Sequence, residues 1–303
     1  MKKAIIIVAI LFLGLVVLFS TAKKEIDLSD KPQITVSTFA LYDISKKLLA
    51  NNARVSMLIP FGVDIHSYEM TPQDRIRVQK SRFFIYSGAG LEPWTDDFVS
   101  QKNAVDMSQY VKLRDASHYD EHHHTSRHNF DPHYWLDIDN MIILTKKLQE
   151  LYSSSFPKEV AKSIAMNAKN YIASLKNIDK LYKKRLHECK RDTIVVSHNA
   201  FGYLSARYGF HVMSLTGLSP DAMPSAKELA KLSDIVREKG IRVLFNEPFE
   251  SNRLIESLAK ETGARVDVLQ PIANITKHEA DDMVDYKLIM NLNLQKLYSA
   301  LGC

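Results

Sequence analysis

The stretch "PKEVAKSIAMNAKNYIASLKNIDKLYKKRLHEC", residues 157–189, divides the chain into two parts. It contains no strand signal and no glycine, and Pro157 suits the first turn of a helix. Its apolar residues recur in steps of three or four, at Val160, Ile164, Ala168, Tyr171, Leu175, Ile178, Tyr182, Leu186 and Cys189. This spacing predicts one amphipathic helix of roughly 30 residues, about 45 Å long.

Short apolar strands alternate with amphipathic helices on both sides of this helix. Before it, we expect strands at 33–39, 53–59, 82–88 and 103–107, and helices at 41–52 and 72–81. After it, we expect strands at 192–198, 210–215, 241–247 and 264–270. The helices between these follow at 200–209, 225–240 and 251–263, and the last two end at Gly240 and Gly263. This alternation predicts an α/β fold with two lobes, each a parallel sheet flanked by helices, joined by one long helix.

The domain boundaries follow from these elements and from the N-terminus. Residues 1–22 are typical of a signal peptide: "MKK", an apolar run, and the small residues Ser20 and Ala22 before the cleavage point. An uncleaved anchor is the alternative. No cysteine follows the run, which excludes a lipid anchor there and favours a soluble protein of a Gram-negative periplasm. We expect an N-terminal lobe at 33–155, a linking helix at 156–190 and a C-terminal lobe at 191–303.

Composition excludes several classes of protein. The chain has 303 residues, 46% of them hydrophobic and 25% charged, which is enough for a large core and argues against disorder. The net charge of +5 is spread along the chain, with no basic stripe interleaved with aromatic residues. Nucleic acid is therefore not an expected partner.

Histidines are concentrated in "DEHHHTSRHNFDPHYW", residues 120–135. Three histidines, one of them in this stretch, stand where a strand or turn ends: His66, His133 and His198. Because ligands of open parallel sheets bind at the carboxyl ends of strands, we expect these three to meet in a cleft between the lobes. Three neutral imidazoles suit Zn²⁺. Isolated histidines are more often surface or structural residues, and we assign that role to His187, His211 and His278.

The motifs around the three histidines resemble those of one family. "GVDIHSYEMTPQD", "DPHYWLD", "SHNAFGYLSARYGF", "GLSPDAMPSAKEL" and "NEPFESNRLIESLAKETGARVDVLQPI" occur in this order. The set is similar to that of the periplasmic zinc/manganese-binding proteins of metal ABC importers, the ZnuA/TroA-like family. The resemblance runs from about residue 33 to the C-terminus. It implies two lobes joined by a single helix, a monomer that delivers metal to an ABC permease of the inner membrane, and His66, His133 and His198 as metal ligands.

The resemblance also bears on the choice of metal. Manganese-selective relatives tend to have a carboxylate where this chain has His198, so three histidines favour zinc. Zinc-binding members typically carry a histidine-rich insertion. The short segment 118–128 resembles one, and we expect it to capture metal weakly through His118, His122, His123, His124 and His128. An accidental polar loop is the alternative.

The fourth ligand is left open by the sequence. Many relatives have an aspartate two residues before a tyrosine at the start of the last helix. Here Tyr286 and Asn293 are in register, but that position is Val284. Asp282 and Asp285 are the nearest carboxylates, and water is the third alternative.

The sequence therefore predicts high-affinity capture of Zn²⁺ for an ABC permease, without catalysis. Capture of Mn²⁺ or Fe²⁺ by the same fold is the first alternative. A zinc hydrolase is the second, because three histidines and a water could activate that water. No HExxH motif is present, and we interpret Glu69, three residues from His66, as a polar group near the site.

Cys189 and Cys303 are the only cysteines. An even number in an exported chain favours a disulfide, which would connect the end of the long helix to the C-terminus. Two unpaired thiols, one buried and one at a frayed terminus, are the alternative.

Overall fold

The computed structural model describes residues 31–116, 130–218, 224–249 and 251–303. Residues 1–31 and 32–303 form separate units, and only the second is described below. Within the described residues, no helix has the length and apolar character needed to cross a membrane. The predicted signal peptide and the histidines of segment 118–128 lie outside the described residues.

The first sheet has four parallel strands in the order β2-β1-β3-β4. Its strands are β1 (Gln33–Val36), β2 (Arg54–Met57), β3 (Phe83–Tyr86) and β4 (Ala104–Asp106). Two helices connect them, α2 (Phe39–Leu49) and α3 (Pro72–Lys80). The start of α3 is fixed locally, because Thr71 and Asp74 form a capping box just before and within its first turn. The strand positions predicted from the sequence are confirmed, with each strand shorter at one or both ends.

The second sheet is also parallel and four-stranded, in the order β10-β9-β7-β8. Its strands are β7 (Thr193–Val196), β8 (His211–Ser214), β9 (Val243–Asn246) and β10 (Arg265–Val268). The helices between them are α6 (Gly202–Tyr208), α7 (Ala226–Glu238) and α8 (Arg253–Thr262). Gly263 ends α8 with φ 75°, and Gly240 follows α7 with φ 60°, a region that favours glycine. Both sequence-predicted helix ends are confirmed.

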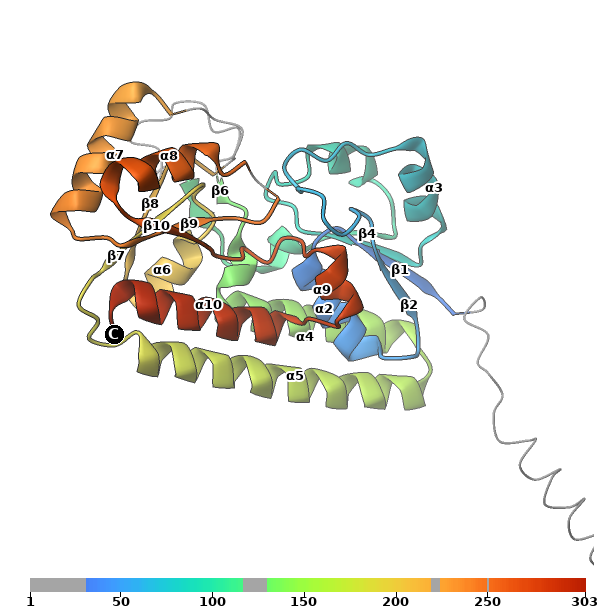
Figure 1. Ribbon diagram of the computed structural model, residues 1–303. Helices are drawn as coiled ribbons and strands as arrows, with labels where there is room; N and C mark the ends of the chain where they lie inside the picture. The colour runs from blue at the N-terminus through green and yellow to red at the C-terminus, as the bar shows by residue number, and fades with distance from the viewer. Residues whose placement is uncertain (1–30, 117–129, 219–223, 250) are drawn as a thin grey trace, which may run out of the picture. The chain divides into compact units, whose positions relative to one another are not determined.

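The long helix α5 (Lys158–Arg185) runs beneath both sheets, beside α4 (Ile138–Ser155) and α10 (Tyr286–Leu301) (Figure 1). Its predicted apolar stripe is buried at Ile164, Ala168, Leu175, Ile178 and Tyr182. These residues belong to a hydrophobic core that also contains residues of β1 and β7. The helix therefore connects the two sheets through a shared core, as the spacing predicted, and ends before Cys189.

The strands β5 (Arg114–Asp115) and β6 (Phe130–Asp131) and the helix α9 (Lys277–Asp281) were not expected from the sequence. β5 and β6 form a short antiparallel pair on either side of the histidine-rich segment. The short helix α9 precedes α10 and is separated from it by a turn in which Met283 has φ 56°.

The expected disulfide is present between Cys189 and Cys303, whose Cα atoms are 3.9 Å apart. The backbone beside it reinforces the connection, because the Arg191 N–H donates to the Leu301 carbonyl over 2.9 Å. The C-terminus of α10 is thereby attached to the segment that leads into β7.

Candidate metal centre

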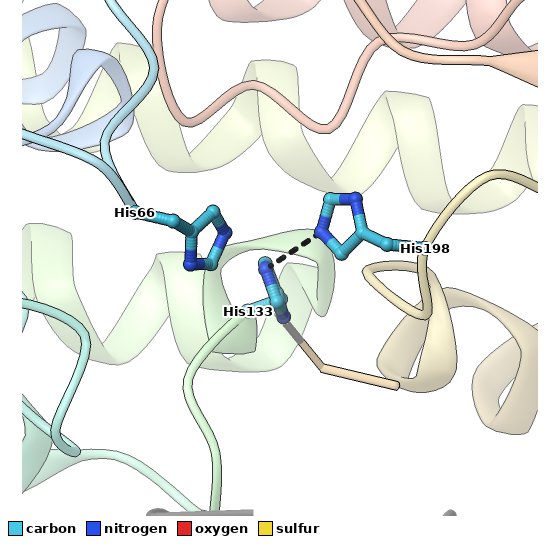
Figure 2. A group of neighbouring side chains, drawn as sticks. All are labelled: His66, His133 and His198. Atoms are coloured by element: carbon cyan, nitrogen blue, oxygen red, sulfur yellow. Dashed lines mark hydrogen bonds between the residues drawn. The ribbon is translucent and has the colours of Figure 1, made fainter. Parts of the chain in front are cut away.

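His66, His133 and His198 converge from three separate segments (Figure 2). His66 lies in the loop between β2 and α3, and His198 lies two residues beyond the end of β7. His133 follows β6 and immediately precedes a 3₁₀ turn, Tyr134–Leu136, that leads into α4. As expected for parallel sheets, the loops that carry His66 and His198 leave the carboxyl ends of strands, one from each sheet.

The three imidazoles are close enough to share one ion. One ligand atom from each lies within 4.8 Å of the other two. Ring centroids are separated by 5.6 Å for His66 and His133, and by 5.4 Å for His66 and His198 and for His133 and His198. The Nε2 atoms of His133 and His198 face each other at 3.5 Å (Figure 2). His133 and His198 are buried, whereas His66 is half-buried.

A carboxylate lies behind each of the two buried imidazoles. Oδ1 of Asp131 is 2.9 Å from Nδ1 of His133, and Oε1 of Glu247 is 2.8 Å from Nδ1 of His198. Both acidic side chains are almost wholly inaccessible to solvent. This arrangement leaves the Nε2 atoms to face the cavity between the sheets.

Neither carboxylate was predicted from the sequence, although each has a local signal. Asp131 and His133 form an Asp-x-His turn in which Oδ1 accepts the His133 N–H over 2.9 Å. Asp64 and His66 repeat the spacing, with a corresponding bond of 3.0 Å. Glu247 directly follows β9, the strand that pairs with β7. A carboxylate at position 247 is therefore beside the end of β7, the strand that leads to His198.

The segment that carries His133 is held by hydrogen bonds to both sheets. The Tyr134 hydroxyl donates to the carbonyl of Ser87, just beyond β3 of the first sheet. The Trp135 indole N–H donates to the carbonyl of Pro271, beyond β10 of the second sheet. The Tyr203 hydroxyl, from α6, donates to the Asp131 carbonyl over 2.9 Å. Because all these groups are buried, the hydrogen bonds hold the segment around His133 in place beside the cavity.

The cavity between the sheets is small, and several of its lining residues are polar. It is lined by Val63, Asp64, Ile65, His66, His133, His198, Glu247, Pro248, Phe249, Gln270, Pro271, Ala273 and Asn274. Glu69, expected near the site, is exposed and is not in this lining. His187, His211 and His278, predicted to be structural or surface residues, are exposed.

Asp282 and Asp285, considered as fourth ligands, lie elsewhere. Asp285 caps α10 and forms an ion pair of 2.9 Å with Lys47. Asp282 pairs with His278 on the exposed surface at 3.0 Å. Neither lines the cavity: Asp282 ends α9 and Asp285 begins α10, and each has another partner. Among the described residues, the group of potential ligand atoms contains the three histidines alone.

The donor set fits a borderline divalent cation. Imidazole nitrogen is a good ligand for Zn²⁺, which accepts three histidines and leaves a fourth position open. The carboxylates behind two of the rings complete a pattern common around metal-binding histidines.

Comparisons with known proteins identify the family of this chain. A family model described as "ZnuA: Zinc-uptake complex component A periplasmic" matches residues 34–300. The zinc-binding protein AdcA of Streptococcus pyogenes is 30% identical over 98% of this chain and 61% of its own length. The high-affinity zinc uptake system protein ZnuA of Bacillus subtilis is 30% identical over 90% of this chain and 88% of its own.

Solved structures show the same fold. The Zn(II)-bound ZnuA-like domain of Streptococcus pneumoniae AdcA has a TM-score of 0.75 and 28% identity, and the match covers 90% of this chain and all of that one. The chain spans about three fifths of the length of the AdcA proteins that it matches. Because the family model covers nearly the whole described chain, the chain belongs to the ZnuA family of zinc-uptake components.

Proposed function

We propose that this protein captures Zn²⁺ outside the cytoplasmic membrane and delivers it to an ABC permease. The observation that carries the proposal is the convergence of three imidazoles from three segments, with the Nε2 atoms of the two buried ones 3.5 Å apart. The names of the relatives AdcA and ZnuA, and the zinc in the AdcA domain, support the same cargo.

Direct titration tests the ligands. His66→Ala, His133→Ala and His198→Ala should each weaken zinc binding, measured by competition with a chelator of known affinity. Removing the hydrogen-bonding partner of a metal ligand lowers metal affinity by about 10- to 100-fold, and removing the ligand itself should lower it more. His278→Ala is the matched control, because that histidine is exposed and does not line the cavity. Wild-type affinity in all three variants would contradict the assignment.

The preference for zinc over manganese rests on the absence of a carboxylate from the ligand group of the described residues. Mn²⁺ favours oxygen donors, whereas imidazole favours Zn²⁺. Competitive titration with Zn²⁺, Mn²⁺ and Fe²⁺ in one metal buffer should place zinc well ahead. Tighter binding of manganese would establish the alternative cargo.

We propose binding without catalysis. A zinc hydrolase needs a base beside the metal-bound water. The two buried carboxylates nearest the histidines, Asp131 and Glu247, are within 2.9 Å of imidazole Nδ1 atoms. A steady-state screen of ester, peptide and phosphoester substrates at saturating zinc should give no turnover above that of free zinc.

The histidine-rich segment, residues 118–128, is proposed as an accessory that binds metal weakly. It can be deleted cleanly, because the paired strands β5 and β6 stand on either side of it and a short turn can replace it. The deletion should preserve the tight site and remove additional weak zinc equivalents in a calorimetric titration. Loss of the tight site on deletion would reverse the assignment.

A further inference from the structure

The four buried side chains behind the cavity form two pairs. Nδ1 of His133 is hydrogen-bonded to Oδ1 of Asp131 at 2.9 Å, and Nδ1 of His198 lies 2.8 Å from Oε1 of Glu247. No side chain of the four is more than 2% exposed. On the opposite side of each ring, the Nε2 atoms face each other across 3.5 Å (Figure 2).

For a neutral imidazole, the side of the ring on which the carboxylate lies matters for metal binding. Such a ring carries one proton, on either Nδ1 or Nε2, and only the other nitrogen has a lone pair for a metal. A carboxylate accepts hydrogen bonds and therefore favours the form with the proton on the nitrogen that faces it. In both pairs that nitrogen is Nδ1, so the lone pair is directed from Nε2 into the cavity.

The backbone places each carboxylate beside its imidazole. Oδ1 of Asp131 also accepts the His133 backbone N–H, and the Asp131 carbonyl accepts the Tyr203 hydroxyl. Glu247 extends from the end of β9, whose residue Phe245 is in register with Val196 of β7, two residues before His198. The position of each carboxylate is therefore set by backbone contacts, at a turn for Asp131 and by strand register for Glu247.

We propose that Asp131 and Glu247 are positioning residues that fix His133 and His198 as Nδ1–H tautomers before metal arrives. The inference rests on the proposed function, zinc capture. Its physical benefit is preorganisation: the metal meets two lone pairs already directed at its place, so little ordering remains to oppose binding. Neither carboxylate belongs to the group of potential ligands.

Long-range ¹H–¹⁵N correlation spectra of the ¹⁵N-labelled, metal-free protein test the proposal. In the wild type, His133 and His198 should both show the Nδ1–H tautomer. In Glu247→Gln the amide can donate to Nδ1, so His198 should shift towards the Nε2–H tautomer while His133 is unchanged. Asp131→Asn should do the reverse.

Zinc affinity is measured on the same proteins by competition with a chelator. Each variant should bind zinc about 10- to 100-fold more weakly. Glu69→Gln is the matched control, because it removes a carboxylate near His66 that is exposed and does not line the cavity; its spectra and affinity should equal those of the wild type.

Several results would overturn the proposal. These are an Nε2–H tautomer at either histidine in the wild type, unchanged zinc affinity in both variants, or reduced affinity with unchanged tautomers. The wild-type spectrum decides the first point even if a variant fails to fold. Absence of zinc binding by a wild type with the expected tautomers would instead refute the proposed function and leave the positioning role supported.

Discussion

At the scale of single residues, the cavity combines two fixed imidazoles with a more accessible one. His133 and His198 are buried against carboxylates, whereas His66 is half-buried in a loop. All three must be neutral to bind metal, which makes binding compete with protons.

Zinc affinity should therefore depend steeply on pH. The pKa of a free histidine side chain lies near 6.5, so below that pH protons displace the metal. Between pH 7 and pH 5, affinity measured in a chelator buffer should fall, and the slope of log K against pH should approach three at the acid end. A flat profile would indicate a site dominated by carboxylates.

Tyr203 gives a second test at this scale. Its hydroxyl accepts the Arg114 N–H over 2.8 Å and donates to the Asp131 carbonyl over 2.9 Å. Tyr203→Phe removes both hydrogen bonds at a buried position and should lower the free energy of unfolding by about 1–3 kcal/mol. Because Asp131 holds His133, zinc binding should weaken as well. Tyr298→Phe, at an exposed tyrosine, should change neither quantity.

At the scale of elements, α5 connects the two sheets through one apolar face. Leu175 on this face is 1% exposed, whereas Leu181 on the same helix is 43% exposed. Leu175→Ala should cost about 2–5 kcal/mol of unfolding free energy, measured with denaturant, because it leaves a cavity in the shared core. Leu181→Ala should stay within about 0.5 kcal/mol. Equal effects would mean that the helix does not pack as described.

The junction of α2, α5 and α10 contains a buried acid. The Asp43 carboxylate, on α2, accepts the Tyr171 hydroxyl of α5 over 2.6 Å and a backbone N–H at Tyr286 of α10. Burial raises the pKa of Asp43 to about 6. The protonated form is favoured in the fold, so the stability that it contributes is complete below the unfolded pKa and is lost as pH rises through 6.

The pH dependence of Asp43→Asn isolates this effect. Between pH 4 and pH 7, wild type should lose about 2–3 kcal/mol of unfolding free energy relative to the variant, which cannot titrate at this position. Asp234→Asn, at an exposed carboxylate on α7, serves as the control and should follow wild type across this range. A constant difference between wild type and Asp43→Asn would contradict the raised pKa.

At the scale of the whole molecule, the disulfide joins residues 114 positions apart. A cross-link of this length restricts the unfolded chain and should contribute about 4–5 kcal/mol, less any strain in the fold. A reductant should therefore lower the midpoint of thermal unfolding, and thiol titration of the denatured, unreduced protein should find no free thiol. Cys189→Ser with Cys303→Ser should match the reduced wild type and be insensitive to reductant.

The sequence by itself determined the strands, the long helix and the family. The alternation of strands with helices and the three-to-four spacing of apolar residues in α5 are local patterns. An element with one buried face shows such a pattern whichever element covers that face. The cysteine pair and the convergence of His66, His133 and His198 were also predicted, and the structure brings each set together. That the histidines bind zinc, and that the lobes divide at 155 and 191, stay predictions.

Only the tertiary structure decided which residues surround the histidines. Glu247 meets His198 through the register of β9 beside β7, and the β5–β6 pair joins residues on opposite sides of the histidine-rich segment. Asp282 and Asp285 were plausible ligands by position alone, but Asp282 pairs with His278 one helical turn earlier and Asp285 pairs with Lys47 of α2, far away in the sequence. The reason is physical: a ligand's neighbours depend on contacts between residues far apart in the chain, and such contacts leave no periodic pattern in the sequence.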